Sequence, residues 1–94
     1  MHSIDRSEES GQCVLRVSGE VELDGARELF ERAAHEETCE TVLLDFTACH
    51  IEDRALSALA DLLNQAHLNV SVRGLRHRQL RLLEYLGAGR PSQL

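Results

Sequence analysis

Aromatic side chains are scarce in this chain of 94 residues, which has two phenylalanines, one tyrosine and no tryptophan. The core must therefore be mainly aliphatic, and there is no cluster of aromatic rings on which nucleic-acid bases could stack. Lysine is absent altogether, and 16 acidic residues stand against 10 basic ones, which gives a net charge of −6. An acidic chain of this kind is not expected to bind nucleic acid or an anionic membrane surface.

Long apolar runs are also missing, because none approaches the roughly 18 residues that a membrane-spanning helix needs. The N-terminus lacks the basic start and the apolar centre of a signal peptide. We therefore expect a cytoplasmic protein with no direct membrane insertion.

Cysteine is limited to Cys13, Cys39 and Cys49, an odd number with no pair spaced as in a CxxC motif. Neither a disulfide framework nor a redox motif is predicted from these residues, and a reducing compartment fits them best. We interpret Cys13 and Cys39 as small apolar fillers or exposed thiols.

The composition is that of a single globular domain, with 43% hydrophobic and 28% charged residues and one proline. We expect this domain to occupy residues 1–94, with a core over about residues 3–87 and a flexible tail over residues 88–94.

Charge is distributed unevenly, because most acids lie in residues 1–61 whereas the last third of the chain is basic. Arg73, Arg76, Arg78 and Arg81 form a local basic patch there. A solvated helix face is a more common origin of such a patch than a docking surface.

The first half of the chain predicts a hairpin and a helix. Residues 3–6 and 13–18 are short strand candidates, and Gly11 between them suits the turn of an antiparallel hairpin. Gly19 is expected to end the second strand. Asp24 is a suitable N-cap for a helix, because apolar residues recur after it with helical spacing.

The middle of the chain predicts a buried strand followed by a helix. Residues 42–46 form a nearly continuous apolar run, which is typical of a strand buried on both faces at the centre of a sheet. A short turn over residues 47–53 leads into the helix, which Asp53 can cap and which extends to about Gln65.

The last elements are a strand over residues 69–73, ended by Gly74, and a helix over residues 75–86. Gly87 is expected to close that helix as a left-handed C′ residue. The element order is thus ββαβαβα. Alternating strands and helices predict an α/β fold with βαβ crossovers in a mostly parallel sheet, in which the first strand is the antiparallel exception.

Several short motifs accompany this element order. They are Ser18-Gly19-Glu20-Val21, Leu44-Asp45-Phe46, Glu52-Asp53 and Val72-Arg73-Gly74-Leu75. Through them the chain resembles, over residues 3–87, the sulfate transporter and anti-sigma factor antagonist (STAS) domain family. The resemblance implies a STAS-like mixed sheet of four or five strands, with helices packed mainly on one face.

In this family, the helix after the central strand begins with a serine or threonine that a partner kinase phosphorylates. A helix N-terminus accommodates phosphate because it has free N–H groups and the positive end of the helix dipole. The family commonly has Asp-Ser-Ser-Gly or Asp-Thr-Ser-Gly there, whereas this chain has Asp53-Arg54-Ala55-Leu56. Ala55, at the phosphosite position, has no hydroxyl.

Two interpretations of this departure are open. Either the module never used phosphorylation, or it still docks a partner constitutively with Arg54 as a fixed charged contact. Ser57 and Thr47 are the nearby hydroxyl residues, but neither lies at the phosphosite position.

The resemblance implies a non-enzymatic interaction module of the anti-sigma factor antagonist type, which binds an anti-sigma factor or a related serine-kinase-like protein. The alternative is a STAS adaptor subunit of a phospholipid or toluene-tolerance type ABC transporter, which docks on the transporter's ATPase. The oligomeric state, monomer or weak homodimer, stays open. The expected contact residues are Glu52, Asp53, Arg54, Ala55, Leu56, Ser57, Gly19 and Asp24.

Catalytic and metal-binding interpretations centre on Cys49 and His50, with Glu52 and Asp53 close by. Adjacent residues rarely reach one ion together, and no second ligand pair has the spacing of a zinc site. Cys49 and His50 as nucleophile and base would need a third, orienting group and a pocket. There is no Gly-rich phosphate loop, so we expect no metal, no cofactor and no enzymatic activity.

Overall fold

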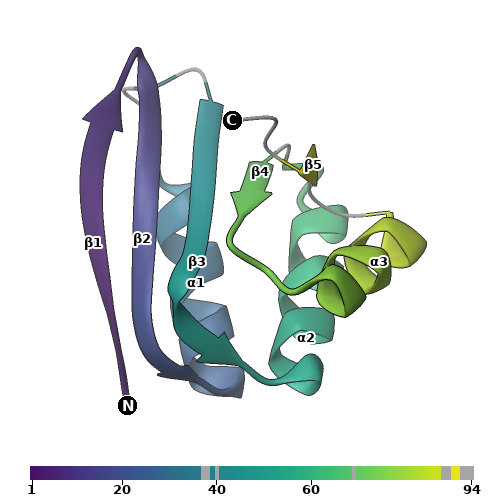
Figure 1. Cartoon of the computed structure of the whole chain (residues 1–94). Helices are drawn as coiled ribbons and strands as arrows, with labels where there is room; N and C mark the ends of the chain where they lie inside the picture. Colours follow the sequence, from purple (N-terminus) through teal and green to yellow (C-terminus); the bar gives the residue numbers. More distant parts are fainter. Residues whose placement is uncertain (37–38, 40, 69, 88–89, 92–94) are drawn as a thin grey trace.

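The chain forms an α/β domain in which a five-stranded mixed sheet carries three helices (Figure 1). The computed structural model describes residues 1–36, 39, 41–68, 70–87 and 90–91, the last two through their backbone. The elements are β1 (His2–Glu9), β2 (Gln12–Val21), α1 (Leu23–Ala34), β3 (Thr41–Ile51), α2 (Asp53–Gln65), β4 (Val70–Arg73), α3 (His77–Leu86) and β5 (Arg90–Pro91).

The strands lie in the sheet in their chain order, from β1 to β5. β1 pairs with β2 in antiparallel sense, and all other neighbours are parallel. The predictions of a mostly parallel sheet, of an antiparallel first strand and of a central third strand are therefore confirmed.

The opening hairpin turns within two residues, Ser10 and Gly11, which have φ angles of 53° and 79°. Positive φ at both turn positions matches the right-handed twist of the flanking strands. The predicted turn at Gly11 is confirmed, but both strands are longer than predicted. Gly19 does not end β2, which continues to Val21 because it still pairs with β3 there.

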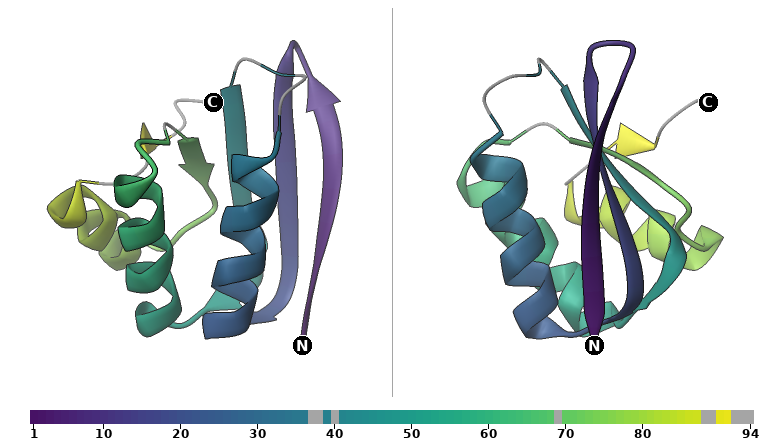
Figure 2. Two further views of the ribbon diagram at one scale, coloured as in Figure 1. Left: turned by 180° about the vertical axis from the view of Figure 1, so that it is seen from behind. Right: turned by 90° about the vertical axis from the view of Figure 1, so that its left-hand side faces the viewer.

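The main core lies between the sheet and helices α1 and α2, which cover one of its faces (Figure 2). α3 packs beside α2, on the side away from α1 (Figure 1). The core is aliphatic, as expected, with Phe46 as its one fully buried aromatic side chain among the described residues. Its largest members include Leu15, Leu29, Leu44, Leu56 and Leu59.

β3 is eleven residues long and runs to Ile51, well beyond the predicted end at residue 46. The extension follows from pairing with β2, since Gly19 aligns with Cys49 and Val21 with Ile51. Cys49 therefore lies on a strand, and the prediction of a turn over residues 47–53 is wrong.

The helix starts also differ from the prediction. α1 and α2 have Glu22 and Glu52 as N-caps, with no side-chain capping bond, and Asp24 and Asp53 lie within the first turns. The predicted capping roles of the two aspartates are therefore wrong, although a carboxylate in a first turn still favours the helix dipole.

α3 begins at His77, two residues later than predicted, and ends at Gly87 with φ 72°. The left-handed closure by Gly87 is confirmed. Residues 90–91 of the predicted flexible tail form β5 against β4, whereas residues 69, 88–89 and 92–94 lie outside the described part of the chain.

A disulfide joins Cys13 to Cys39, with 5.7 Å between their Cα atoms. The interpretation of these residues as unpaired fillers or exposed thiols is wrong. Cys13 is the second residue of β2 and pairs with Val42 of β3, so the chain just before β3 arrives beside it. Sequence spacing could not reveal this, because parallel pairing brings together residues that are 26 positions apart.

Within the described residues, no helix is both long enough and apolar enough to cross a membrane.

Candidate functional site

The two segments expected to make contacts lie side by side at one edge of the sheet. Val21 and Ile51 are register partners at the carboxyl ends of β2 and β3, and the Glu52 amide donates to the Val21 carbonyl at 3.3 Å. Because β4 runs parallel to β3, the start of α3 reaches the same edge (Figure 1). We call residues 19–24, 49–54 and 74–79 together the carboxyl-end surface.

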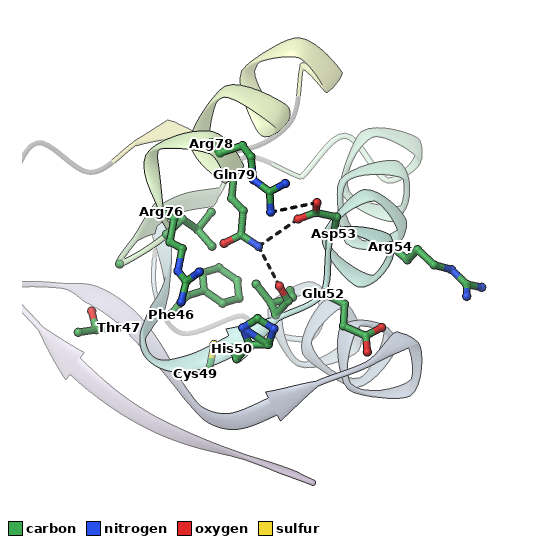
Figure 3. Close-up of a pocket in the computed structure, with 13 residues that line it drawn as sticks. Phe46, Thr47, Cys49, His50, Glu52, Asp53, Arg54, Arg76, Arg78 and Gln79 are labelled. Carbon is green, nitrogen blue, oxygen red and sulfur yellow. Dashed lines mark hydrogen bonds and ion pairs between the residues drawn. The ribbon is translucent and has the colours of Figure 1, made fainter.

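A pocket of about 490 Å³ opens on the carboxyl-end surface (Figure 3). Its lining combines the end of β3, the first turn of α2 and the first turn of α3. The lining residues include Phe46, Cys49, His50, Asp53, Arg76, Arg78 and Gln79.

The Gln79 side chain connects the three elements that line the pocket. Its side-chain amide donates to the Ile51 carbonyl at 2.8 Å and to the Asp53 carboxylate at 3.3 Å, and the residue is 8% exposed. A buried bond to a backbone carbonyl fixes the start of α3 against the end of β3. The Arg78–Asp53 pair at 3.4 Å is largely exposed and adds little.

Arg54 and Arg76 are the arginines of this surface without a carboxylate within 4.0 Å among the described residues. Arg76 extends toward Phe46, whereas Arg54 extends to the other side of the first turn of α2 (Figure 3). There Arg54 borders two further hollows, of about 500 and 420 Å³, together with Leu23, whose exposure is 44%. The arrangement offers accessible positive charge beside an apolar side chain.

The structure separates the expected contact residues of α2 into two groups. Glu52, Asp53 and Arg54 are exposed and Ser57 is partly exposed. Ala55 and Leu56 are fully buried, with 0% exposure.

The inclusion of Ala55 and Leu56 in a contact surface is therefore corrected. Both lie one helical turn before the buried residues Leu59 and Ala60 and so share the core-facing stripe of α2. Ala55, which the resemblance equates with the family phosphosite, is thus inside the core.

Gly19 and Asp24 are exposed at the same edge. Gly19 has φ 88°, and a side chain there would collide with the carbonyl oxygen of Met1. This close approach of Met1, just before β1, explains why a glycine stands at position 19. Gly19 can contribute only backbone to a contact, whereas Asp24 presents a carboxylate.

Cys49 and His50 do not form a catalytic pair in this structure. As successive residues of β3 their side chains project to alternate sides of the strand, and no hydrogen bond joins them within the described residues. Burial, followed by the nearby carboxylate of Asp45, raises the pKa of the Cys49 thiol to about 11. The sulfur is a neutral thiol at neutral pH, which is a poor nucleophile.

Among the described residues, the group of three or more potential ligands that comes within 4.8 Å consists of Glu8, Cys13 and Cys39. The two sulfurs are bonded to each other and the Arg6 guanidinium lies 3.1 Å from Cys13, so the cluster does not present a metal site in this form. The run from Cys49 to Asp53 brings no such set together.

Asp45 is a buried charge that sequence reasoning passed over as part of an apolar run. It is 3% exposed, accepts hydrogen bonds from the hydroxyl of Thr47 at 2.6 Å and its amide at 2.9 Å, and pairs with Arg16 and Arg73 at 3.3 and 3.1 Å. Burial by itself would raise the pKa of Asp45, but these donors outweigh it and lower the pKa from 3.8 to about 2.

This carboxylate links three strands, because Arg16 lies on β2 and Arg73 on β4. The available signal was a pair of arginines on strands flanking one acid in the central strand.

The role of the α3 start was also missed, although Arg76 and Arg78 had been noted as part of a basic patch. Parallel topology places that helix start at the same edge.

Comparison with known proteins identifies no family, since no protein-family profile matches the chain. No curated protein sequence matches it either. The fold is similar to part of the structure described as "Crystal Structure Analysis of Mglu", with a TM-score of 0.51 and 16% identity over 96% of this chain. The chain spans only 19% of the length of that protein, so the likeness concerns the fold of one part of it.

Proposed function

We propose that this chain is a STAS-like protein-interaction module of the anti-sigma factor antagonist type, which binds an anti-sigma factor or a related serine-kinase-like protein. The observation that carries the proposal is the convergence of the two expected contact segments on the carboxyl-end surface, with Arg54 exposed between them. The sheet order and the antiparallel first strand are compatible with the STAS-like fold.

Binding at this surface is constitutive rather than switched by phosphorylation. Ala55 has no hydroxyl and is fully buried, so no kinase can act at the family position. The hydroxyl of Thr47 donates to Asp45 at 2.6 Å and is used in holding the sheet. Ser57 is partly exposed on α2 and borders the hollow of about 500 Å³ beside Arg54, but it lies two residues after the family phosphosite position.

The partner contact combines charge with a small apolar anchor. Arg54 and Leu23 border the same two hollows, and Glu22, Asp24 and Glu52 line the smaller of the two. A partner that fits would offer a carboxylate to Arg54 and an apolar side chain to Leu23, with positive charge opposite the acids.

The proposed role is non-enzymatic and needs no cofactor. The Cys49 thiol, whose pKa is raised to about 11, is the remaining free cysteine and is a poor nucleophile at neutral pH. Gln79 and Arg78 hold the Asp53 carboxylate in local contacts at 3.3 and 3.4 Å. These contacts build a surface rather than an acid–base site.

The test is affinity purification of the tagged protein from its own cells, with identification of bound proteins by mass spectrometry. An anti-sigma factor or serine-kinase-like partner supports the proposal, whereas an ABC ATPase would establish the transporter-adaptor alternative. Arg54→Glu should weaken the complex by about 10–100-fold, as expected when a charge contact becomes repulsive.

Arg81→Glu is the matched control, because Arg81 is exposed on α3 and borders none of the three hollows described above. The Arg81→Glu variant should bind the partner with the same affinity as the unmodified chain. Both variants are first compared with the unmodified chain by thermal melting, so that loss of binding is not confused with loss of fold. Equal binding by Arg54→Glu and the unmodified chain would refute docking at the carboxyl-end surface.

A further inference from the structure

The Cys13–Cys39 disulfide lies at the opposite end of the sheet from the carboxyl-end surface. Cys13 is the second residue of β2 and pairs with Val42 at the beginning of β3, whereas Val21 and Ile51 mark the other end of the same two strands (Figure 1). The disulfide therefore has chemistry that the proposed docking function does not use.

We propose that Cys13–Cys39 is a site of reversible thiol–disulfide exchange with a dithiol reductant, in which Cys39 is attacked and Cys13 is the leaving group. Two features distinguish the sulfurs. Cys13 is 0% exposed, whereas Cys39 is partly exposed, so an external thiolate reaches Cys39. The Arg6 guanidinium lies 3.1 Å from the sulfur of Cys13 and 3.9 Å from that of Cys39.

Arg6 favours departure of Cys13 because a cation beside a sulfur stabilises the thiolate. A leaving thiol of lower pKa departs faster. Glu36 and Glu8 hold the guanidinium in place, with Arg6 Nε at 2.7 Å from Glu36 and Nη2 at 2.9 Å from Glu8. Their negative charge and the burial of Cys13 both act against a thiolate at Cys13, so the proposed leaving-group role depends on the direct contact of Arg6 with Cys13.

The exchange proceeds in two displacements. A thiolate of the reductant attacks Cys39 Sγ, a mixed disulfide forms, the Cys13–Cys39 bond breaks and its electron pair leaves on Cys13 Sγ. The second thiol of the reductant then loses its proton and attacks the reductant's other sulfur, which is bonded to Cys39 in the mixed disulfide. Cys39 is released as a thiolate. The protein gains two electrons and, once both thiolates are protonated, two protons, while the dithiol is oxidised to its disulfide.

The direction of attack is tested in the Cys49→Ser protein, which retains only the two cysteines of interest. The oxidised protein is treated with glutathione, a thiol without a second sulfhydryl, and is quenched with acid, and the adduct is located by mass spectrometry. We expect glutathione on Cys39 and a free thiol at Cys13. An adduct mainly on Cys13, or two free thiols before any reductant is added, would overturn the proposal.

The role of Arg6 is tested by the rate of reduction by dithiothreitol. Arg6→Gln should slow reduction about tenfold, because Cys13 loses the adjacent cation, and Arg6→Lys should restore part of the rate. Glu36→Gln is the matched control, since it breaks the same ion pair but leaves the guanidinium available to Cys13. A loss of rate equal in Glu36→Gln and Arg6→Gln would show that the ion pair, not the cation at the sulfur, matters.

Discussion

Asp45 is the buried charge that ties the central strand to both of its neighbours, and replacing it with asparagine is a sharp test of that role. Asparagine keeps the size of the side chain and one oxygen for the Thr47 donors but removes the negative charge opposite Arg16 and Arg73. The lowering of the Asp45 pKa from 3.8 to about 2 corresponds to about 2 kcal/mol in favour of the folded, charged form. Asp45→Asn should lower the free energy of unfolding by about that amount at neutral pH.

The pH dependence of the stability tests whether the charge of Asp45 stabilises the folded chain. Because the pKa of Asp45 is lower in the folded chain, its contribution is fully present above the ordinary pKa of 3.8 and is lost as the pH falls through about 2. The difference in stability between the unmodified chain and Asp45→Asn should therefore narrow as the pH falls through that range.

The assay is urea unfolding followed by far-ultraviolet circular dichroism over this pH range. Asp61→Asn on the exposed face of α2 is the control, and it should change stability by less than about 0.5 kcal/mol. A difference for Asp45→Asn that stays constant as the pH falls would mean that packing, not charge, accounts for the loss.

Three further substitutions test separate parts of the fold by the same unfolding assay. Gly74→Ala should cost about 2–4 kcal/mol, because φ at Gly74 is 85° and an added Cβ would collide with the backbone of Thr47; a neutral effect would contradict this packing. Cys39→Ser should lower the stability of the oxidised protein by about 3 kcal/mol, since the bond to Cys13 spans a sequence separation of 26, and an unchanged midpoint would argue against the disulfide. Ala55→Asp should cost about 3 kcal/mol or more, because a carboxylate would enter the core; a variant as stable as the unmodified chain would place Ala55 at the surface.

Elements with strong local signals could be predicted from the sequence. The Ser10–Gly11 hairpin turn, the apolar central strand and the end of α3 at Gly87 each depend on residues adjacent in the chain. Element limits that depend on partners could not be predicted. β3 continues to Ile51 through its pairing with β2, and the continuous apolar run that predicted the strand ends at Phe46.

The candidate site shows the same division. Parallel topology was enough to expect the ends of β2 and β3 at one edge, and Arg54 is exposed there. The burial of Ala55 needed the position of α2 on the sheet, although its spacing from Leu59 was a usable signal. The Cys13–Cys39 bond depends on strand pairing over a long sequence separation and had no local signal at all.

The internal contacts also bear on how the proposed docking surface binds. Asp45 joins β2, β3 and β4 through Arg16 and Arg73, and Gln79 fastens the start of α3 to the carbonyl of Ile51. These contacts fix the middle of β2 and β3, the end of β4 and the start of α3 before any partner arrives. A surface that is already ordered loses little conformational entropy on binding, so modest contacts at the carboxyl-end surface can give measurable affinity. The constitutive binding that we propose would need no phosphorylation to order this surface, which agrees with the burial of Ala55.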